Sequence, residues 1–453
     1  MDGSDKMTNR IAILKPLTVQ SVNGPAYTYI VGQGPIGNTA IRCAYVSSNG
    51  ILSGFTLTNG HTRGVGNYDK ERYGGGVWCG NGGVVSNCVI SSNGAFYGGG
   101  GVYCMGGSVK NSVISNNFAG MYGGGVDCRF GTTENCAISH NSSSNSGGGV
   151  YLYIGAAADN CVISFNYAHY SGGGISTLWG GPLNNCMVMG NSADSIGGGV
   201  KINAGGIIQN CTITRNSAVS SGGGVWISSG DVVENSVIYS NDAPSGVNWY
   251  NSGVSLGYYY CCLTPDPGSP GNNNVTNDPQ LTLAGRLNSI SPCINAGNNA
   301  YVQNPVDLDG NPRIVFGTVD MGSYEYIVSS SDYDGDGLNN SQELITWHTD
   351  PTLPDTDRDG SSDYAEVMIA GTSPNDCDSR LALYIGETTN YTLLSWSNTG
   401  SRTYNLWYNH DLMTGTWQKV GTYTNLPPGI TWYTNNLVTN TVFFRVTVVN
   451  TNL

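Results

Sequence analysis

The sequence predicts an all-β protein built from three consecutive parts: a parallel β-helix, a short acidic linker and a small β-sandwich. Three observations lead to this fold class. A Gly-Gly-Gly signature recurs at nearly constant spacing, apolar residues alternate within each repeat, and two acidic loops follow the repeats. Such self-similarity at a fixed period is typical of a repeat architecture, in which each unit packs on its neighbours.

The repeat unit is 24–25 residues long, as three series of positions show. The glycine triplets end at Gly76, Gly101, Gly125, Gly149, Gly174, Gly199 and Gly224. A first asparagine series contains Asn87, Asn111, Asn135, Asn160, Asn185, Asn210 and Asn235. A second contains Asn93, Asn117, Asn141, Asn166, Asn191, Asn216 and Asn241. The three series keep the same spacing, so the repeats are structural units.

Each unit has room for three short strands: one after the glycines, one around residues 84–85 and one around 88–90 in the first clear unit. Apolar residues two positions apart indicate strands with one buried face. No amphipathic helical stretch separates them. Three strands per coil predict a parallel β-helix over residues 1–327, with blurred coils at 1–72 and irregular closing coils at 246–327. Stacked coils should form asparagine ladders.

The 13 cysteines fall mostly into inward-facing rows of this β-helix. Cys136, Cys161, Cys186 and Cys211 share one position in consecutive units, and Cys79 begins another row. A free cysteine behaves as a small apolar core residue. We therefore expect core thiols, with disulfides between adjacent coils as the alternative. The chain contains no CxxC pair, which argues against a zinc site.

The charge of the chain excludes several classes of partner. The 453 residues include 18 Lys and Arg against 31 Asp and Glu, a formal net charge of −13. Such a surface repels nucleic acids, acidic polysaccharides and anionic membranes. No apolar run approaches the about 18 residues of a membrane span, and the first residues lack the apolar core of a signal sequence. We expect neutral molecules or cations as partners.

The linker, residues 328–378, contains two calcium-loop patterns of acidic residues at alternating positions. The first loop would bind through Asp332, Asp334, Asp336, Leu338, Asn340 and Glu343, and the second through Asp355, Asp357, Asp359, Ser361, Asp363 and Glu366. Leu338 and Ser361 would contribute main-chain carbonyls. The alternative is a pair of solvated acidic loops. The pattern resembles the thrombospondin type 3-like repeats of secreted bacterial proteins, which serve as stiff spacers and imply Ca²⁺ as cofactor.

Residues 379–453 alternate as short strands separated by turn residues, which predicts a small β-sandwich. The expected strands are 391–396, 404–408, 417–420, 431–433 and 442–449. Trp396 and Trp407 should lie in its core. With Trp417 and Trp432, they also form an alternative sugar-binding surface.

Aromatic residues gather along one edge of the predicted β-helix. Since Val77 and Cys79 point inward, Trp78 should point outward, and the residues at its position in later coils include Tyr103, Asp127 and Tyr151. Tyr97, Tyr122, Arg129, Tyr170 and Trp179 complete the candidate ligand-binding set. Sugars stack on such rings, whose body is apolar and whose tip is polar. The alternative is that aromatic residues simply suit strands.

A second outward row is unusually apolar. It contains Val89, Val113, Ala137, Val162, Met187, Thr212 and Val237. We expect another segment of the chain or a partner to cover this row, unless these are ordinary β-branched residues on an open sheet.

Catalytic residues are harder to place. A glycosidase needs two carboxylates that face one cleft, whereas the aromatic edge offers only Asp127, with Arg129 two residues later. Asp69 and Glu71 lie in what we take to be an inserted loop at residues 61–72. No set of residues forms a complete catalytic constellation.

The glycine-rich coils, with Ser291–Gly297, Asp307–Arg313 and Val319–Tyr326, resemble secreted bacterial right-handed parallel β-helix proteins of the pectate lyase-like superfold. The closest resemblance is to a β-helix carbohydrate-binding module of xylan-degrading gut bacteria. It implies a secreted or cell-surface, non-catalytic module that binds a neutral plant polysaccharide such as xylan, beside a catalytic domain in a parent protein. The alternatives are a polysaccharide lyase or glycoside hydrolase, and a surface adhesin or structural stalk.

Overall fold

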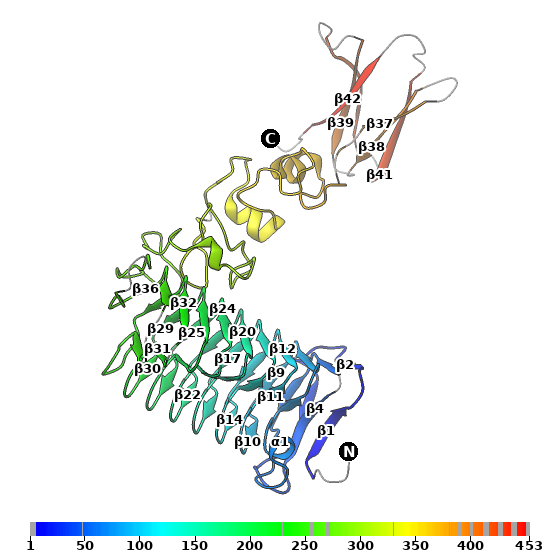
Figure 1. The fold of residues 1–453 in the computed structure, drawn as a ribbon. Coiled ribbons are helices and arrows are strands. Elements are labelled where there is room, and N and C mark those ends of the chain that lie inside the picture. Colours follow the sequence, from blue (N-terminus) through cyan, green and yellow to red (C-terminus); the bar gives the residue numbers. More distant parts are fainter. Residues whose placement is uncertain are drawn as a thin grey trace. The chain divides into compact units, whose positions relative to one another are not determined.

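A computed structural model confirms the all-β fold class (Figure 1). The structure describes residues 6–47, 49–228, 230–253, 257–268, 272–328, 330–379, 381, 383–387, 392–398, 402–410, 416–424, 429–435 and 442–449. The chain divides into two compact units, Met1–Tyr326 and Ile327–Leu453. The first corresponds to the expected β-helix, and the second contains the acidic loops and the C-terminal strands.

The β-helix consists of long parallel sheets that run along the stack of coils. Sheet A contains β1 (Thr8–Ile13), β4 (Ile41–Val46), β7 (Val77–Cys79), β11 (Val102–Met105), β15 (Val126–Arg129), β19 (Val150–Tyr153), β23 (Ile175–Leu178), β27 (Val200–Ile202), β31 (Val225–Ile227) and β34 (Trp249–Asn251). Sheet B contains β2 (Thr18–Gln20), β5 (Ile51–Ser53), β8 (Val84–Ser86), β12 (Ser108–Lys110), β16 (Thr132–Glu134), β20 (Ala157–Asp159), β24 (Pro182–Asn184), β28 (Ile207–Gln209), β32 (Val232–Glu234) and β35 (Gly257–Tyr259). Sheet C contains β3 (Tyr29–Val31), β6 (Thr56–Thr58), β9 (Val89–Ser91), β13 (Val113–Ser115), β17 (Ala137–Ser139), β21 (Val162–Ser164), β25 (Met187–Met189), β29 (Thr212–Thr214), β33 (Val237–Tyr239) and β36 (Cys262–Leu263).

A fourth, narrow sheet differs from the expected three strands per coil. Sheet D contains β10 (Gly94–Ala95), β14 (Phe118–Ala119), β18 (Ser142–Ser143), β22 (Tyr167–Ala168), β26 (Ser192–Ala193) and β30 (Ser217–Ala218). Its strands are two residues long, too short to show an alternating pattern in the sequence. The region 1–72, whose repeat is blurred, nevertheless contains two complete coils, β1–β3 and β4–β6.

The core is one continuous apolar cluster that runs through the described coils from Ile13 to Leu263. Equivalent residues pair directly, because Ile114 lies in register with Ile90 in the coil before and Ile138 in the coil after. The cysteines of the first unit are buried free thiols, most of them in this stack and Cys262 and Cys293 in a second cluster, whereas Cys377 of the second unit is exposed. The register that the sequence predicts is therefore the register of the structure.

The first and second glycines of each triplet are required for different geometric reasons. The first glycine of a triplet adopts a left-handed conformation, as at Gly123 with φ of 59°, which a residue with a Cβ adopts only at a cost. At the next position, a Cβ on Gly124 would lie 2.3 Å from the carbonyl oxygen of Ser142 and 2.4 Å from that of Gly148. The glycines thus allow neighbouring coils to approach at the corner.

The second asparagine series forms a buried ladder. The Asn166 amide donates to the carbonyl of Ile138 at 2.9 Å and to Oδ1 of Asn191 at 3.0 Å. Its own Oδ1 accepts from the main-chain N–H and the side-chain amide of Asn141, at 2.9 and 3.0 Å. Each residue satisfies main-chain groups at the turn, as buried polar groups require.

The returning segment, residues 276–326, lies along sheet C and the first asparagine series. The amide of Asn235 donates to the carbonyl of Asn298 at 2.9 Å. The amide of Asn210 donates to the carbonyl of Tyr301, in the 3₁₀ turn η1 (Asn299–Tyr301), at 3.2 Å. The amide of Asn185 donates to the carbonyl of Val306 at 3.1 Å. The first asparagine series thus holds a distant part of the chain against the coils.

This segment covers part of the apolar row of sheet C. Met187, Thr212 and Val237 are buried, and the N–H of Ser323 donates to Oγ1 of Thr212 at 3.0 Å. Val113, which lies beyond the covered coils, is exposed. The expectation that a segment of the chain covers this row is confirmed for its C-terminal half.

The second unit begins with the acidic loops and ends in two antiparallel sheets. Each loop leads into a short π-helical segment, η2 (Gln342–Trp347) and η3 (Ala365–Ala370). One sheet contains β37 (Leu383–Glu387), β38 (Thr392–Asn398) and β41 (Gly429–Asn435), and the other contains β39 (Thr403–Asn409), β40 (Gln418–Tyr423) and β42 (Phe443–Val449). Leu394 and Trp396 of the first sheet share a core with Tyr404 and Leu406 of the second.

These strands agree with the sequence pattern, apart from β37, which the pattern missed. Tyr391, at the start of one expected strand, and Ser329, near the expected linker boundary, lie outside the described residues. Trp396 is a core residue as expected. The expectation that Trp407 lies in the core is wrong: it is only half-buried, and its indole N–H donates to Oγ1 of Thr447.

Asn166→Ala is expected to destabilise the β-helix by roughly 3 kcal/mol, because it leaves the carbonyl of Ile138 and the N–H of Asn141 in the preceding coil without their partners and breaks the amide contacts to Asn141 and Asn191. Chemical denaturation should measure this loss. Asn81→Ala, at an exposed turn position, is the control and should change stability by less than about 0.5 kcal/mol. Equal stability of the two variants would contradict the role of the ladder.

Candidate functional site

The candidate ligand-binding residues of sheet A form a single outward column. Trp78 pairs with Tyr103, Tyr103 with Asp127, and Asp127 with Tyr151 in successive strands. One further ring precedes them: Tyr45 lies in register with Trp78 and stacks on it, with ring centroids 4.5 Å apart and planes 6° apart. The sequence analysis missed Tyr45 because the repeat is blurred there. The outward register of the column is as predicted.

These side chains point away from the β-helix core but are not exposed. Trp78, Tyr103 and Tyr151 are at most 7% exposed, and Asp127 is fully buried. Trp78, Tyr103 and Tyr73 form a small apolar cluster of their own, packed against Tyr45 and Tyr97. The expectation that the column presents its rings to solvent is therefore wrong. The aromatic set is instead a second core outside the coils.

The loop at residues 61–72 provides this cover. Its short helix α1 (Tyr68–Glu71) is capped by Asn67. The indole N–H of Trp78 donates to the carbonyl of Asp69 at 3.1 Å. The ring of Tyr68 meets that of Tyr97 edge-on, with centroids 4.8 Å apart. Buried Arg42 donates to the carbonyl of Lys70 at 2.6 Å. The charge-rich insertion thus covers the first rings of the column.

An ion pair lies at the centre of the cluster. Nε and Nη2 of Arg129 lie 3.1 and 3.2 Å from the two carboxylate oxygens of Asp127, and Nη2 also donates to the Tyr73 hydroxyl at 3.1 Å. The guanidinium lies over the rings of Tyr73, Tyr103 and Tyr153, at 4.9, 5.4 and 5.2 Å from their centroids. Burial raises the pKa of Asp127 to about 6, and Arg129 opposes this shift.

Gly98 makes room for this ion pair. A Cβ at this position would lie 2.3 Å from Oδ2 of Asp127 and 2.8 Å from Cε1 of Tyr73. Gly98 is the extra glycine in the run 98–101, and it pairs with Tyr122 in the next coil. The extra glycine therefore shifts Tyr97 by one position relative to Tyr122.

The remaining candidates lie at increasing distance from the buried cluster. Half-buried Tyr122 stacks on Tyr151 with centroids 4.6 Å apart. Tyr153 joins Tyr151 to the exposed ring of Trp179, at 6.4 and 5.4 Å. Tyr170 is exposed, and no ring contact in the described part of the chain joins it to the others. Tyr122 and Trp179 are therefore the more accessible predicted residues of the ring system, and half-buried Tyr153, which contacts Trp179, is absent from the predicted set.

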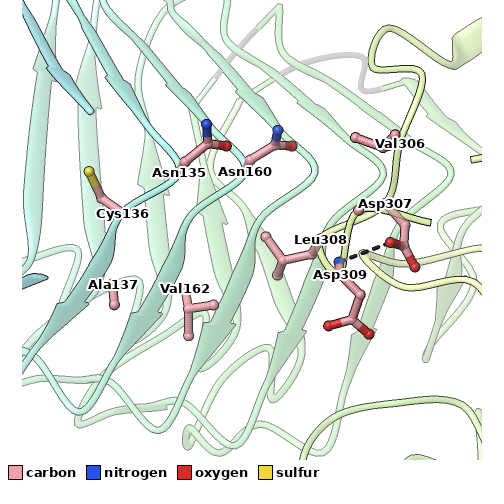
Figure 2. A pocket seen from close by; sticks show the side chains of 10 residues that line it. Asn135, Cys136, Ala137, Asn160, Val162, Val306, Asp307, Leu308 and Asp309 are labelled. Atoms are coloured by element: carbon pink, nitrogen blue, oxygen red, sulfur yellow. Dashed lines mark hydrogen bonds between the residues drawn. The ribbon is translucent and has the colours of Figure 1, made fainter. Parts of the chain in front are cut away.

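A cavity of about 370 Å³ lies where the returning segment ends over sheet C (Figure 2). Figure 2 shows the amides of Asn135 and Asn160 side by side, with Leu308 pointing towards Val162. One oxygen of Asp307 accepts from the main-chain N–H groups of residues 309 and 311, at 2.9 and 2.8 Å, and the other from that of residue 325 at 3.0 Å. These bonds give Asp307 a structural role in fixing the loop that forms one wall.

The acidic loops bring their carboxylates together as the spacing predicts. One oxygen each from Asp332, Asp334 and Asp336 lies within 4.8 Å of the others, and the same holds for Asp355, Asp357 and Asp359. The N–H groups of Leu338 and Ser361 donate back to the third Asp of each loop, at 2.7 and 2.8 Å. The residues at positions 1, 3 and 5 therefore converge on one point in each loop.

The last ligand position provides the strongest test of whether a cation fits. Glu343 and Glu366 are fully buried, and neither carboxylate has a hydrogen-bond partner among the described residues. Burial and the neighbouring aspartates raise their pKa to about 8 and about 7. Buried carboxylates without partners are costly unless a cation compensates them. The oxygen-rich donor set thus fits Ca²⁺.

Asn340 and Asp363, at position 9, support their loops through hydrogen bonds. Oδ1 of Asn340 accepts from the N–H of Tyr333 at 3.1 Å, and Oδ1 of Asp363 accepts from that of Thr356 at 2.9 Å. The two loops are also connected, because the N–H of Tyr364 donates to Oδ2 of Asp336 at 2.7 Å. An ion bound in one loop would therefore order a residue of the other.

Comparison with known proteins supports the assignment of the first acidic loop as a calcium-binding type of repeat. Residues 332–354 match the family described as the bacterial TSP3 repeat. Repeats of this family usually bind calcium and occur in extracellular proteins. No curated protein matches the chain. Within the described residues, no helix is long and apolar enough to cross a membrane. The chain thus contains a calcium-binding type of repeat after a parallel β-helix.

Removal of calcium is expected to destabilise the second unit, because a ligand that binds only the folded loops stabilises them by mass action. Calorimetric titration after chelation should detect about two sites. Glu343→Gln should weaken one site and Glu366→Gln the other, whereas Gln342→Ala keeps every predicted carboxylate and is the control. The absence of any calcium-dependent heat or thermal shift would contradict the assignment.

Trp78→Ala is expected to cost about 3–5 kcal/mol of stability, because it empties the centre of a buried cluster. Thermal and chemical denaturation should measure this loss. Tyr170→Ala removes an exposed ring from the candidate set and should leave stability within about 0.5 kcal/mol of the wild type. An unchanged melting curve for Trp78→Ala would mean that the ring is exposed in solution.

Proposed function

We propose that the chain is a non-catalytic, extracellular module that binds a neutral plant polysaccharide, such as xylan or a related β-glycan. The observation that carries this proposal is the ring system on the outer side of sheet A, which extends from Tyr45 through Tyr151 and Tyr153 to Trp179. The buried rings around Trp78 hold the more accessible rings of Tyr153 and Trp179 in place through a chain of ring contacts. Exposed aromatic rings held in this way offer flat apolar surfaces for sugar faces.

The charges of this surface favour a neutral ligand. The Arg129 guanidinium lies within the ring system, and Asp127 neutralises it. Free cations would be needed to attract an acidic polymer, and the net charge of −13 opposes one. We therefore place pectin-like acidic polysaccharides behind neutral ones as ligands.

The same ion pair favours binding over catalysis. Glycoside hydrolysis requires two carboxylates on either side of the scissile bond. Asp127 is fully buried and directed at Arg129, which suits a structural role. In this proposal the TSP3 segment is a calcium-stabilised spacer that connects the β-helix to the β-sandwich, and any catalytic activity belongs to a partner domain.

Affinity for the polysaccharide is expected to depend weakly on salt, because binding to a neutral glycan exchanges few ions. Affinity-gel electrophoresis with xylan, mixed-linkage β-glucan, mannan, β-1,3-glucan and pectin should show retention on neutral polymers, with less than about a twofold change up to roughly 0.5 M salt.

Assays for reducing ends and unsaturated products on the same polymers distinguish the alternatives. Product formation would favour a hydrolase or lyase. A steep loss of affinity with salt would indicate an acidic ligand. A complete lack of retention would contradict the binding function and favour an adhesin or a stalk.

A further inference from the structure

One corner of the β-helix carries large apolar residues in a backbone conformation that favours glycine. Phe130, Ile154 and Trp179, which we call the corner ridge, have φ of 58°, 47° and 61°. They lie in three consecutive coils between sheets A and B. A left-handed conformation is unfavourable for any residue with a Cβ, and especially for β-branched isoleucine.

The neighbouring coils show that the corner itself does not need such residues. The same position holds Gly106, with φ of 75°, in the coil before the corner ridge, and Ala204, with φ of 68°, in the coil after it. The main-chain hydrogen bonds that align these coils continue through all of them, from the N–H of Gly106 to that of Trp179. Small residues therefore satisfy the fold at this position.

Burial in the core does not explain the three large side chains either. Phe130 is 56% exposed, Ile154 36% and Trp179 55%. Backbone strain that persists without a folding benefit is typical of functional positions, and contiguous exposed apolar residues mark interaction sites.

A second corner of the same β-helix provides an internal comparison. Between sheets C and D, the left-handed position holds Asn116, His140, Phe165, Gly190 and Arg215 in consecutive coils. This column mixes polar, charged, small and aromatic residues. Left-handed corners in this fold therefore have no general preference for apolar side chains, and the composition of the corner ridge is specific to it.

The surroundings of the corner ridge are uncharged overall. The ring of Tyr153 lies beside Trp179, and the Arg129 guanidinium above Tyr153 is neutralised by Asp127. On the other side, Gly155 has no atom within 4 Å of the place where a Cβ would stand. The corner ridge thus projects above a low, open surface and offers rings without a net charge.

We propose that the corner ridge binds a linear, neutral β-1,4-linked glycan whose chain runs along the β-helix axis; this inference rests on the proposed function. Phe130 and Trp179 are two coils apart, about 9.5 Å, which is comparable with the length of two sugars in an extended β-1,4-linked chain. Alternate sugars of such a chain present the same face. Each ring would then stack on an equivalent sugar, with Ile154 beneath the one between them.

Glycine substitutions provide a sharp test, because they remove the ring and relieve the backbone. Phe130→Gly and Trp179→Gly should each keep or raise the thermal midpoint, whereas affinity for the best β-1,4-linked hexasaccharide should fall at least about tenfold. Isothermal titration with xylohexaose, cellohexaose and mannohexaose measures this effect, and β-1,3-linked laminarihexaose is the comparison ligand. Phe165→Gly is the matched control, since Phe165 has φ of 55° and is 53% exposed; its affinity should be unchanged.

The outcomes separate this inference from the function on which it rests. Wild-type affinity in the corner-ridge variants, or a preference of the wild type for laminarihexaose, would overturn the corner ridge as the β-1,4-glycan site while glycan binding remained established. A lack of binding to every oligosaccharide and polysaccharide would overturn both. An equal loss in Phe165→Gly would also overturn the assignment to the corner ridge.

Discussion

The rest of the structure depends on in-register stacking of parallel coils. Each coil donates its main-chain hydrogen bonds to the next, so a residue at one position always meets its equivalents about 4.8 Å away. This constraint explains why identical residues recur. A buried amide such as that of Asn166 has side-chain partners in both neighbouring coils because each of them also carries asparagine at this position. The glycines at the corners are required for the same reason, because the carbonyls of the next coil occupy the space of a Cβ.

Stacking also determines which exceptions the fold tolerates. The outward column of sheet A breaks the repeat with Trp78, Tyr103 and Asp127, and the chain adds a covering loop and an extra glycine to accommodate them. A buried ion pair is costly to desolvate, and it is retained here because Arg129 also lies over three aromatic rings. The cluster is therefore a local core that fixes the shape of the accessible surface beside it.

The acidic loops differ from the asparagine ladder in how their buried polar groups are satisfied. In the second asparagine series, buried amides such as that of Asn166 have protein partners, whereas the carboxylates of Glu343 and Glu366 are buried without a hydrogen bond among the described residues. Their carboxylates need an external charge. Local sequence spacing is sufficient to bring the aspartates together, because the ligands come from within twelve positions of one another. Residues 332–354, which contain the first of these loops, match the bacterial TSP3 repeat.

The sequence by itself determined the coil register, the glycine corners, the asparagine ladders, the calcium loops and most of the C-terminal strands. All of these are local or periodic, and a period reveals the direction of a side chain relative to its own strand. Only the tertiary structure decided what lies over an outward side chain. Residues 61–72 bury Trp78, and residues 276–326 bury Met187 and Val237, whereas Trp179 remains exposed. Coverage depends on segments that return from elsewhere in the chain, and periodicity contains no information on where they dock.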